Sequence, residues 1–383
     1  MNKRRLAMLA VLLLLFGLAA LLSMSGDPAK PVGPAVEFPR EMTPEARRRS
    51  AARRTHAVEL ASADGTHKRV VKQDPLLASL PRGPGRTAVV LEANAIRNSP
   101  LGEMLLTCMD GARVAELAKE RSGIDLLQDL DRVAITGDGM TISGNFGAAD
   151  WDALLPPEMH RANYGEGGRI YSLPTPAGRM EDGGRPESIA IWGDSFVVVG
   201  SEDELQRTID RLEGRGEEGP PAIDESQAYG EVYGVVGSED LARFFGEGEK
   251  TAGLAEALLR AGSTMELHAD TRGDVGMVAR FAGEDPALVR DLGKTMGGLL
   301  SAARLEAMTS GNADAVRLLD MASLDSGDGD FNLEVALPQT YLAELAARCA
   351  ERRAKRQENR ERAMSEWPAE APEASPFEPA PSP

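Results

Sequence analysis

Residues 188–212, SIAIWGDSFVVVGSEDELQRTIDRL, contain the signals of a hairpin followed by a helix. Two apolar runs, SIAIW and FVVVG, flank Gly193 and Asp194, which favour a tight turn between antiparallel strands. Ser201 is followed three residues later by Glu204, and this spacing is the capping box that starts a helix. The stretch therefore predicts antiparallel strands and a helix in one α+β unit.

The same kinds of signal extend upstream to Thr87 and define a first unit. The run TAVVLEA predicts a strand, and Ser99 and Pro100 then mark the start of a helix through LGEMLLTCMDGARVAELAKE. Two alternating runs, RVAIT and MTISGNF, surround Gly137-Asp138-Gly139 and predict a hairpin with one buried face. A first α+β unit is therefore predicted over residues 87–213.

A second unit with a similar order of elements is predicted over residues 225–361. A linker of Gly, Pro and acidic residues, 214–224, separates it from the first unit. Its predicted elements are the strand EVYGVVG, a helix capped by Ser238, the hairpin TMELHAD with VGMVARF, a helix from Asp285 to Met308, the strands MASLD and FNLEVALP, and a helix over 338–361. The final helix loses its apolar stripe towards its end. The predicted fold class is α+β with antiparallel sheets.

The N-terminal run LAMLAVLLLLFGLAALLSM, residues 6–24, carries no charge and follows a basic segment. As a helix that rises about 1.5 Å per residue, it would cross roughly the 30 Å hydrocarbon core of a bilayer. A cleavable signal peptide remains open as the alternative, with Ser23-Met24-Ser25 as a weak cleavage site. Because positive charges stay inside, residues 1–5 are predicted in the cytoplasm. We expect a single-pass inner-membrane protein whose body lies in the periplasm or extracytoplasmic space.

Residues 25–86 and 364–383 are predicted to be disordered, the first as a tether and the second as an acidic tail. Both are rich in proline and poor in large apolar residues, so neither buries enough surface to offset the entropy of ordering. The arginines at 47–49 and 53–54 resemble a nucleic-acid or lipid patch. No aromatic residue interleaves them for base stacking, so a solvated short helix that starts at Thr43 is preferred. The tether could also fold back on the acidic body.

The whole chain is acidic, with 43 Lys and Arg residues against 60 Asp and Glu residues and a net charge of −17. Such a surface repels nucleic acid, so no nucleic-acid partner is expected. The chain has two cysteines, Cys108 and Cys349. In an oxidising compartment they could form a disulfide, and two buried thiols are the alternative; the sequence leaves both open.

Three short motifs fit ordinary turns better than binding sites. Residues 214–219 match G-x-G-x-x-G, but a helix precedes them and two glutamates would repel phosphate. The acidic run 325–330 lacks the EF-hand order of glycine and closing glutamate, so a hairpin turn is preferred over a calcium loop. Arg272-Gly273-Asp274 matches an adhesive tripeptide, yet Gly and Asp are what a tight turn needs. No metal and no cofactor is predicted.

No catalytic site is predicted. Of the four histidines, only His160 and His268 lie in the two predicted units. His268 alternates within TMELHAD and shares a face with Glu266, so a solvent-facing strand position is expected for it. Ser195 lies in a predicted turn without the glycine spacing of a nucleophile elbow.

Three segments resemble a group of bacterial, membrane-anchored, exported proteins built from duplicated ferredoxin-like α+β units. They are VVLEANAIRNSPLGEMLL from Val89, GIDLLQDLDRVAITGD from Gly123 and IAIWGDSFVVVGSEDELQRTIDR from Ile189. The resemblance extends from Thr87 to Leu345. It implies two ferredoxin-like-type units behind an N-terminal transmembrane helix and tether, in an exported location. The group has no assigned activity, so the resemblance implies no site residues.

Together these patterns predict a membrane-anchored extracytoplasmic interaction or structural protein that is not an enzyme. Its expected partners are the lipid bilayer, through residues 6–24, and a protein that the sequence does not identify. A homo-oligomer is a further expectation that the sequence leaves open. The alternative is an exported hydrolase that uses scattered carboxylates together with His160 or His268.

Overall fold

The computed structural model describes residues 36–366 apart from 62–67, 110–112, 114, 117–118, 121–122, 126, 174–187, 217, 246–251, 263 and 328. The predicted membrane span at 6–24 and most of the predicted tail, 367–383, lie outside these residues. Within the described ranges, no helix is both long enough and apolar enough to cross a membrane.

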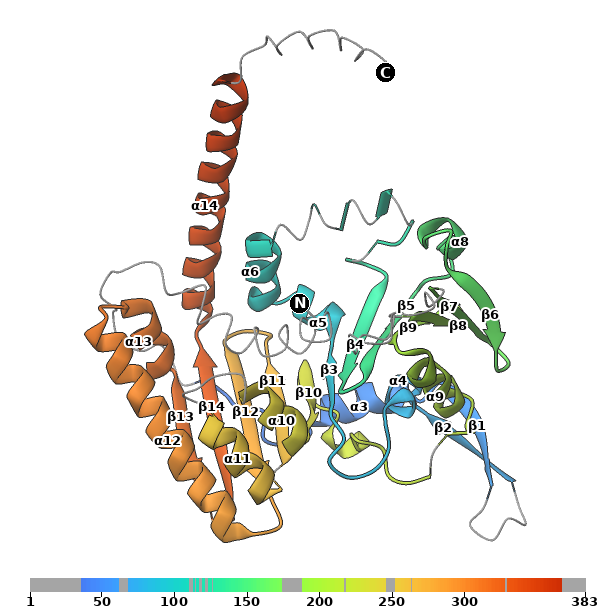
Figure 1. Cartoon of the computed structure of the whole chain (residues 1–383), viewed down its shortest axis with the longest axis horizontal. Coiled ribbons are helices and arrows are strands. Elements are labelled where there is room, and N and C mark those ends of the chain that lie inside the picture. The colour runs from blue at the N-terminus through green and yellow to red at the C-terminus, as the bar shows by residue number, and fades with distance from the viewer. Residues whose placement is uncertain are drawn as a thin grey trace, which may run out of the picture.

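The described residues form one antiparallel sheet of twelve strands and a separate two-stranded hairpin. The strand order in the large sheet is β13-β14-β12-β11-β10-β3-β4-β5-β9-β8-β7-β6, which Figure 1 shows from edge to edge. The strands are β3 (Ala88–Leu91), β4 (Leu130–Thr136), β5 (Gly139–Gly144), β6 (His160–Tyr164), β7 (Gly168–Ser172), β8 (Ser188–Trp192), β9 (Phe196–Gly200), β10 (Val232–Val236), β11 (Thr264–Asp270), β12 (Val275–Ala282), β13 (Ala322–Ser326) and β14 (Asp330–Leu337). The predicted α+β class is confirmed, but the predicted separate sheets are one continuous sheet.

Two halves of this sheet meet at the antiparallel pair β3 and β10. Val90 lies opposite Tyr233, and Val89 lies opposite Gly234. A Cβ atom at Gly234 would come within 2.3 Å of the Ala88 carbonyl oxygen, so this close approach requires glycine. Both strands are unbroken apolar runs that are buried on both faces, as central strands usually are. The joint between the halves therefore lies in the middle of the core.

Five strands of each half follow the same order when β6 and β7, which lie between β5 and β8 in the chain, are left out of the count. The order β3-β4-β5-β9-β8 in the first half corresponds to β10-β11-β12-β14-β13 in the second, and β7 and β6 extend the first half. In both halves the first strand pairs directly with the second. The predicted similarity of the two units is thus visible in their pairing.

The predicted linker at 214–224 is packed against the segment before β3. Ile223 is fully buried, and the Ala222 amide donates a hydrogen bond to the Pro81 carbonyl. One apolar side chain of this linker, Ile223, therefore lies in the core shared with β3 and β10.

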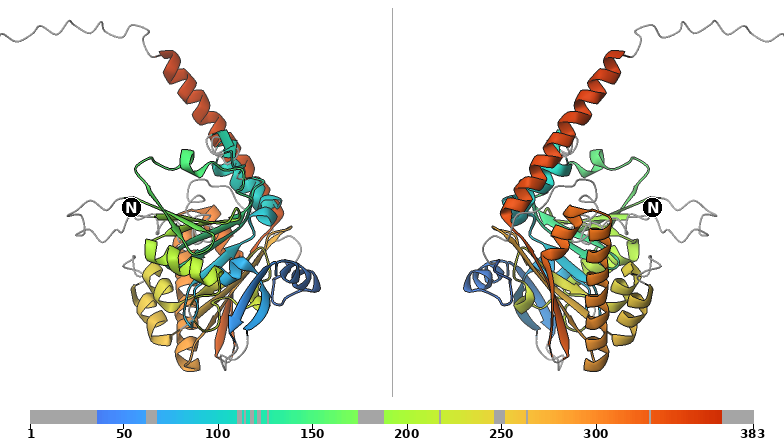
Figure 2. Two further views of the ribbon diagram at one scale, coloured as in Figure 1. Left: turned by 90° about the vertical axis from the view of Figure 1, so that its right-hand side faces the viewer. Right: turned by 90° about the vertical axis from the view of Figure 1, so that its left-hand side faces the viewer.

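Helices cover one face of the second half of the sheet (Figures 1 and 2). Asp285 caps α12 as predicted, since its carboxylate accepts from the Ala287 amide. Val289 of this helix packs in one core with Leu267 and Phe281 of the strands. The helices are α10 (Ser238–Phe245), α11 (Ala252–Ala261), α12 (Pro286–Thr309) and α13 (Ala313–Asp320). On the first half, the same face packs against Ile124, Phe146 and the short helix α8 (Trp151–Leu154).

The opposite face, which we call the second face, is covered largely by the residues that precede β3. Leu76, Leu77 and Leu80 pack with Val90 and Tyr233 in the core on this face. The predicted disorder is therefore wrong for residues 36–61 and 68–86, because the prediction overlooked this short leucine cluster. The elements on this side are α3 (Pro44–Ala52), β1 (His56–Ala61), β2 (Lys68–Gln73), α4 (Pro75–Ser79), α9 (Glu202–Leu212) and the 3-10 turn η2 (Glu225–Gln227). The predicted helix start at Thr43 is confirmed, since its hydroxyl accepts from the Ala46 amide.

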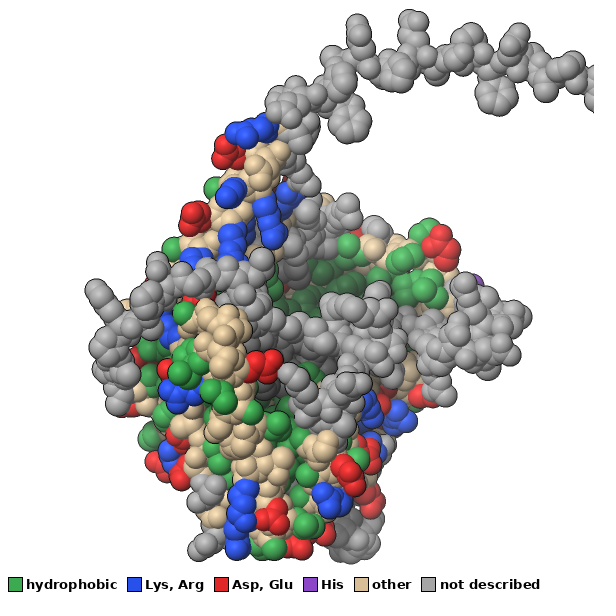
Figure 3. Space-filling view, turned by 60° about the vertical axis from the view of Figure 1, so that its left-hand side comes forward, with side chains coloured by type: hydrophobic (Ala, Val, Ile, Leu, Met, Phe, Trp, Pro, Cys, Tyr) green, Lys and Arg blue, Asp and Glu red, His purple; other side chains and the backbone are tan. Residues whose placement is uncertain are grey.

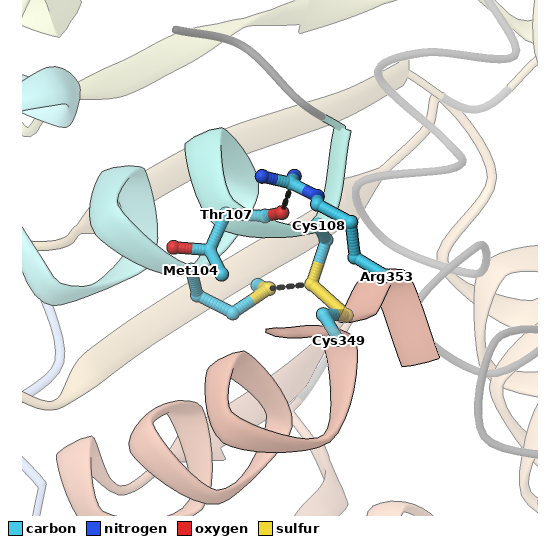
Figure 4. The surroundings of a disulfide bond; sticks show 5 residues. All are labelled: Met104, Thr107, Cys108, Cys349 and Arg353. Carbon is cyan, nitrogen blue, oxygen red and sulfur yellow. Dashed lines mark hydrogen bonds between the residues drawn. A yellow bond between two sulfur atoms is a disulfide. The ribbon is translucent and has the colours of Figure 1, made fainter. Parts of the chain in front are cut away.

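The last helix is joined to the first half of the chain. After α5 (Ala93–Arg97), α6 (Pro100–Met109) packs against α14 (Gln339–Glu366). Cys108 of α6 and Cys349 of α14 form a disulfide with their Cα atoms 5.0 Å apart (Figure 4). Arg353 also donates to the Thr107 carbonyl beside it. Of the two alternatives for the cysteines, the disulfide is the one observed.

Beyond this contact, α14 leaves the body and projects into solvent (Figures 1 and 2). The predicted loss of its apolar stripe explains why: Tyr341, Leu342 and Leu345 are buried, whereas most described side chains after Cys349 are exposed. Figure 3 shows Lys and Arg side chains along the projecting part. The helix is therefore anchored by its first turns and by the disulfide.

Candidate functional site

Five charged or polar side chains meet on the second face, at the joint between the two halves of the sheet. We call them the central cluster: Asp74, Arg132, Arg53, Glu92 and Tyr233. Asp74 caps α4, Arg132 lies on β4 and Tyr233 lies on β10. Arg53 directly follows α3, and Glu92 directly follows β3. Segments far apart in the sequence thus contribute side chains to one cluster.

Asp74 and Arg132 form a bidentate ion pair that is almost closed to solvent. Arg132 Nη1 donates to Asp74 Oδ2 at 2.7 Å, and Nη2 donates to Oδ1 at 3.0 Å. The two side chains are 3% and 4% exposed. Burial alone would lower the pKa of Arg132, but the hydrogen bonds and the charge of Asp74 outweigh burial and raise this pKa. The arginine is therefore cationic at any ordinary pH.

A second bidentate pair holds α3 on the sheet. Arg53 Nη1 and Nη2 each donate to one oxygen of Glu92 at 2.5 Å, and the Tyr233 hydroxyl donates to Glu92 Oε1 at 3.0 Å. Burial lowers the pKa of Arg53, but the hydrogen bond with Glu92 and the charge of Glu92 together outweigh burial, and the net shift of the pKa is upward. Burial and the Glu92 charge raise the pKa of Tyr233, so its hydroxyl keeps the proton that it donates.

Other arginines of the N-terminal segment also pair with carboxylates of the body. These pairs join Arg40 to Glu334, Arg49 to Glu231 and Arg54 to Glu225. Of the five arginines at 47–49 and 53–54, Arg47 and Arg48 are exposed as predicted for a solvated helix, whereas the other three pair with carboxylates of the body. These pairs hold the segment on the acidic body, which was one of the alternatives that the sequence left open.

An open groove of about 610 Å³ adjoins the central cluster, and we call it the polar groove. Its polar lining includes Asn94, Gln128, Asp129, Asp131 and Asn145, and its apolar lining includes Trp192. Arg53 and Arg132 reach it from the central cluster. Ser195, in the predicted turn between β8 and β9, lies at its rim as an exposed residue. The volume falls in the range of small-ligand sites, about 300–1,000 Å³.

Some side chains of the polar groove already make hydrogen bonds within the protein, and others do not. Gln128 and Asn145 are exposed, and no hydrogen bond occupies their carboxamides within the described part of the chain. Trp192 is fixed, because its indole nitrogen donates to Glu213 Oε1 at 3.1 Å and its ring meets Phe196 edge to face at 5.8 Å. Burial would raise the pKa of Glu213, but this bond and others to the carboxylate lower it. The groove thus combines a fixed aromatic ring with free amide groups.

One buried nitrogen atom of Arg132, beside the polar groove, makes no hydrogen bond with the residues that the structure describes. Arg132 uses both terminal nitrogens for Asp74, and its Nε has no hydrogen-bond partner among the described residues. Asp131 Oδ2 lies 3.5 Å from Nε, beyond ordinary hydrogen-bond length. A buried unpaired donor costs about 1–3 kcal/mol. The Nε atom is closed to solvent, so this cost is part of the folded state as it stands.

A smaller cavity of about 320 Å³ lies on the second face over the other half of the sheet. Arg40 and Arg280 line it together with His268, Glu266 and Tyr229. Arg40 is paired with Glu334, and Arg280 is paired with Asp330. Its charged groups therefore already neutralise one another.

His268 is buried in this cavity, with 4% exposure, so its predicted solvent-facing position is wrong. The Tyr229 ring stacks on the imidazole with centroids 3.7 Å apart. Nδ1 lies 3.1 Å from the Tyr229 carbonyl oxygen, and Nε2 lies 3.0 Å from Glu266 Oε1. Both ring nitrogens therefore lie against oxygen atoms of the chain, and neither is directed towards open space. This arrangement does not suit a general base.

We expect Glu266→Gln to lower the free energy of unfolding by up to about 1 kcal/mol at pH 7 and by much less at pH 3. The hydrogen bond with His268 lowers the pKa of Glu266. A carboxyl group with a lowered folded-state pKa stabilises the fold above its unfolded pKa, near 4.3, and this contribution disappears as the pH falls through the folded pKa. Urea unfolding at both pH values measures the difference.

Glu256→Gln, on the exposed side of α11, is the matched control, and it should change little at either pH. An effect of Glu266→Gln that is equal at pH 7 and pH 3 would contradict the assigned ion pair.

His160 and His268 are not brought together. His160 is exposed on β6, the edge strand of the first half, whereas His268 lies on β11 in the second half. The two histidines named for the hydrolase alternative therefore do not share a site.

The three sequence motifs form parts of the fold. In the glycine-rich motif, Gly216 packs against Arg211 of α9. In the tripeptide, Arg272 pairs with Asp270. In the acidic run, Asp330 closes the predicted hairpin by accepting the Gly327 amide on its carbonyl. Among the residues that the structure describes, no group of three or more potential metal ligands occurs.

The sequence prediction named no residue of the central cluster or the polar groove as part of a site. For two of these residues, the sequence did contain a signal of a buried ion pair. Glu92 and Arg132 stand next to apolar strand residues, where a charge is unexpected unless it is paired. Asp74, Gln128 and Asn145 carried no such signal, because they lie in ordinary turn and cap sequences.

Comparison with known protein families, with curated proteins and with solved structures finds no match to the chain. A proposal about function therefore rests on the fold and on the geometry of the groove.

Proposed function

We propose that the protein is an extracytoplasmic binding protein that acts through the polar groove and not through catalysis. The polar groove carries this proposal, because it combines the amide groups of Gln128 and Asn145, which have no hydrogen-bond partner among the described residues, with the Trp192 ring, which is held by Glu213. Rigid, partly unsatisfied polar surfaces suit ligand recognition. The proposed partner of the groove is a component of the cell envelope, and the bilayer is contacted through residues 6–24.

Two observations support the extracytoplasmic location. Disulfides persist mainly in oxidising compartments, and Cys108 and Cys349 are joined. The apolar run at 6–24 is long enough to carry the chain to a membrane and is preceded by positive charges. Neither observation depends on the other.

We expect the disulfide to form in cells only when the N-terminal run is present. Deletion of residues 1–24 should leave the chain in the cytoplasm, where thiols stay reduced. Alkylation with a maleimide reagent before and after reduction measures this: full-length protein should be labelled only after reduction, and the truncated protein before it. The variant Cys108→Ser gives the signal of a free Cys349. Reactive thiols in the full-length, membrane-fractionated protein would contradict the proposed location.

The binding role is tested by photo-crosslinking in cells. Benzoylphenylalanine is placed at Gln128 in the polar groove and, as the control, at Asn163, an exposed residue of β6. We expect a discrete crosslinked product from position 128 and none of the same size from position 163. Equal patterns at the two positions, or no product at either, would overturn the proposed use of the groove.

We also infer that the two halves of the sheet arose by duplication of one α+β unit. Their common strand order supports this inference. The ferredoxin-like assignment of that unit stays a prediction. It would require a rearranged order, because a split βαβ unit separates the strands that here pair directly.

A further inference from the structure

We propose that the polar groove binds a segment of a neutral saccharide chain. This proposal rests on the proposed function of the same groove and adds the chemical class of its ligand. The groove is open and about 610 Å³ in volume, so it can hold part of a longer chain that continues into solvent.

The hydrogen-bonding groups of the groove match hydroxyl groups. A sugar hydroxyl both donates and accepts, and a carboxamide does the same from one planar group. Gln128 and Asn145 present such groups without partners among the described residues, and Asn94 lies in the same lining. Asn94 Oδ1 already accepts from Arg97 and Asn98, so its amide nitrogen is the part of the carboxamide that remains as a donor. Neighbouring hydroxyls on a sugar ring can therefore be bound by adjacent amides.

The charges of the groove favour a neutral ligand over an anionic one. Its two arginines are neutralised by partners of their own, Arg132 by Asp74 and Arg53 by Glu92. Asp129 and Asp131 in the lining then leave the groove with a negative balance. Phosphates and uronic acids would be repelled, whereas carboxylates accept hydrogen bonds well from hydroxyl groups.

The apolar part of the groove suits the carbon face of a sugar ring. Trp192 is half-buried, and its orientation is fixed by Glu213 and by Phe196. An aromatic ring held in this way offers a flat apolar surface at low entropic cost. A pyranose has one such face lined by C–H groups, and it can stack there while its hydroxyls reach the amides.

The unpaired Arg132 Nε supplies an independent observation. Arg132 is 4% exposed, and its Nε points to no partner among the described residues although the residue lines the groove. Because the Nε atom is itself closed to solvent, a ligand oxygen would satisfy this donor only after a neighbouring side chain moves aside. A ring or hydroxyl oxygen can do so without bringing a negative charge next to Asp131.

The test uses full-length oxidised protein in lauryldimethylamine oxide, a detergent without a sugar headgroup, and measures binding by isothermal titration calorimetry. The probes are cellotetraose, maltotetraose and chitotetraose as neutral chains, and tetragalacturonate and inorganic phosphate as anions. We expect at least one neutral chain to bind and neither anion to do so. Binding of the anions alone, or of no neutral chain, would overturn the proposal.

The variant Gln128→Ala with Asn145→Ala removes two exposed carboxamides and should weaken binding of that neutral chain by roughly tenfold or more, since each lost hydrogen bond contributes on the order of a few-fold to tenfold. Asn163→Ala, exposed on β6, is the matched control and should bind as the wild type does. Equal binding by the double variant would place the sugar elsewhere and overturn the proposal. If position 128 crosslinks in cells but no neutral chain binds, the ligand class is wrong and the proposed function stands; if neither occurs, both fail.

Discussion

Asp74→Asn should lower the free energy of unfolding by about 3–5 kcal/mol, which is the usual result of removing one partner from a buried ion pair. Arg132 would then remain cationic and 4% exposed without its bidentate carboxylate. Asn keeps the side-chain oxygen that caps α4 by accepting from the Leu76 amide, so the loss would report mainly on the charge. Urea unfolding of the oxidised protein, followed by circular dichroism, measures the change.

Two further variants separate the buried pair from ordinary surface electrostatics. Asp131→Asn removes a carboxylate that lies 3.5 Å from Arg132 Nε but is 48% exposed, so it should cost under about 1 kcal/mol. Asp74→Asn combined with Arg132→Met removes both charges and should recover much of the loss, since an apolar replacement of a buried pair is often neutral. A loss for Asp74→Asn as small as that for Asp131→Asn would show that the pair is not desolvated in solution.

Local elements of the fold were predictable where the signal lay within a few residues. The β8–β9 hairpin and the start of α9 follow from Gly193-Asp194 and Ser201, and the Ser201 hydroxyl accepts from the Glu204 amide as the capping box requires. The second hydrogen bond of a capping box, from the Ser201 amide to the Glu204 carboxylate, is not the one that Glu204 makes. The Glu204 carboxylate accepts from Arg211 Nη2 at 2.6 Å, so it is used in a buried pair and not on the backbone.

Long-range features were not predictable from local patterns. The pairing of β3 with β10 depends on Gly234 allowing the backbones to approach, and no local rule relates Gly234 to Ala88. The ordering of the N-terminal segment depends on Arg53 reaching Glu92, which is a contact between residues 39 positions apart. Composition alone predicted disorder there, because it counts apolar residues and cannot count ion pairs across the fold.

The error for His268 has the same origin. Alternation in TMELHAD correctly placed Glu266 and His268 on one face of β11, and they are hydrogen-bonded. That face was expected to meet solvent because its side chains are polar, but Pro39 and Arg40, from the segment predicted to be disordered, line the cavity that holds His268. The polar groove was missed for a related reason: its lining residues come from distant segments that only the completed sheet brings together.

Removal of the disulfide by Cys108→Ser with Cys349→Ser should lower the free energy of unfolding by about 2–4 kcal/mol. The bond spans a sequence separation of 241 residues, and cross-links that close long loops restrict the unfolded chain strongly. It also joins α6 to α14 (Figure 4). Beside it, Leu101 and Met104 of α6 share a core with Leu342 of α14. Guanidinium unfolding with and without dithiothreitol measures the effect.

The double serine variant provides the control for the reducing agent. Wild-type protein should lose about 2–4 kcal/mol on reduction, whereas the variant should unfold at the same midpoint with or without dithiothreitol. Because α14 has few buried side chains after Cys349, its projecting part should exchange amide hydrogens quickly whether or not the disulfide is present. The turns around Tyr341 should lose their protection from exchange only when the disulfide is absent. If reduction leaves the wild-type midpoint and the protection around Tyr341 unchanged, the packing of α6 against α14 suffices alone, and the disulfide contributes nothing measurable to the fold.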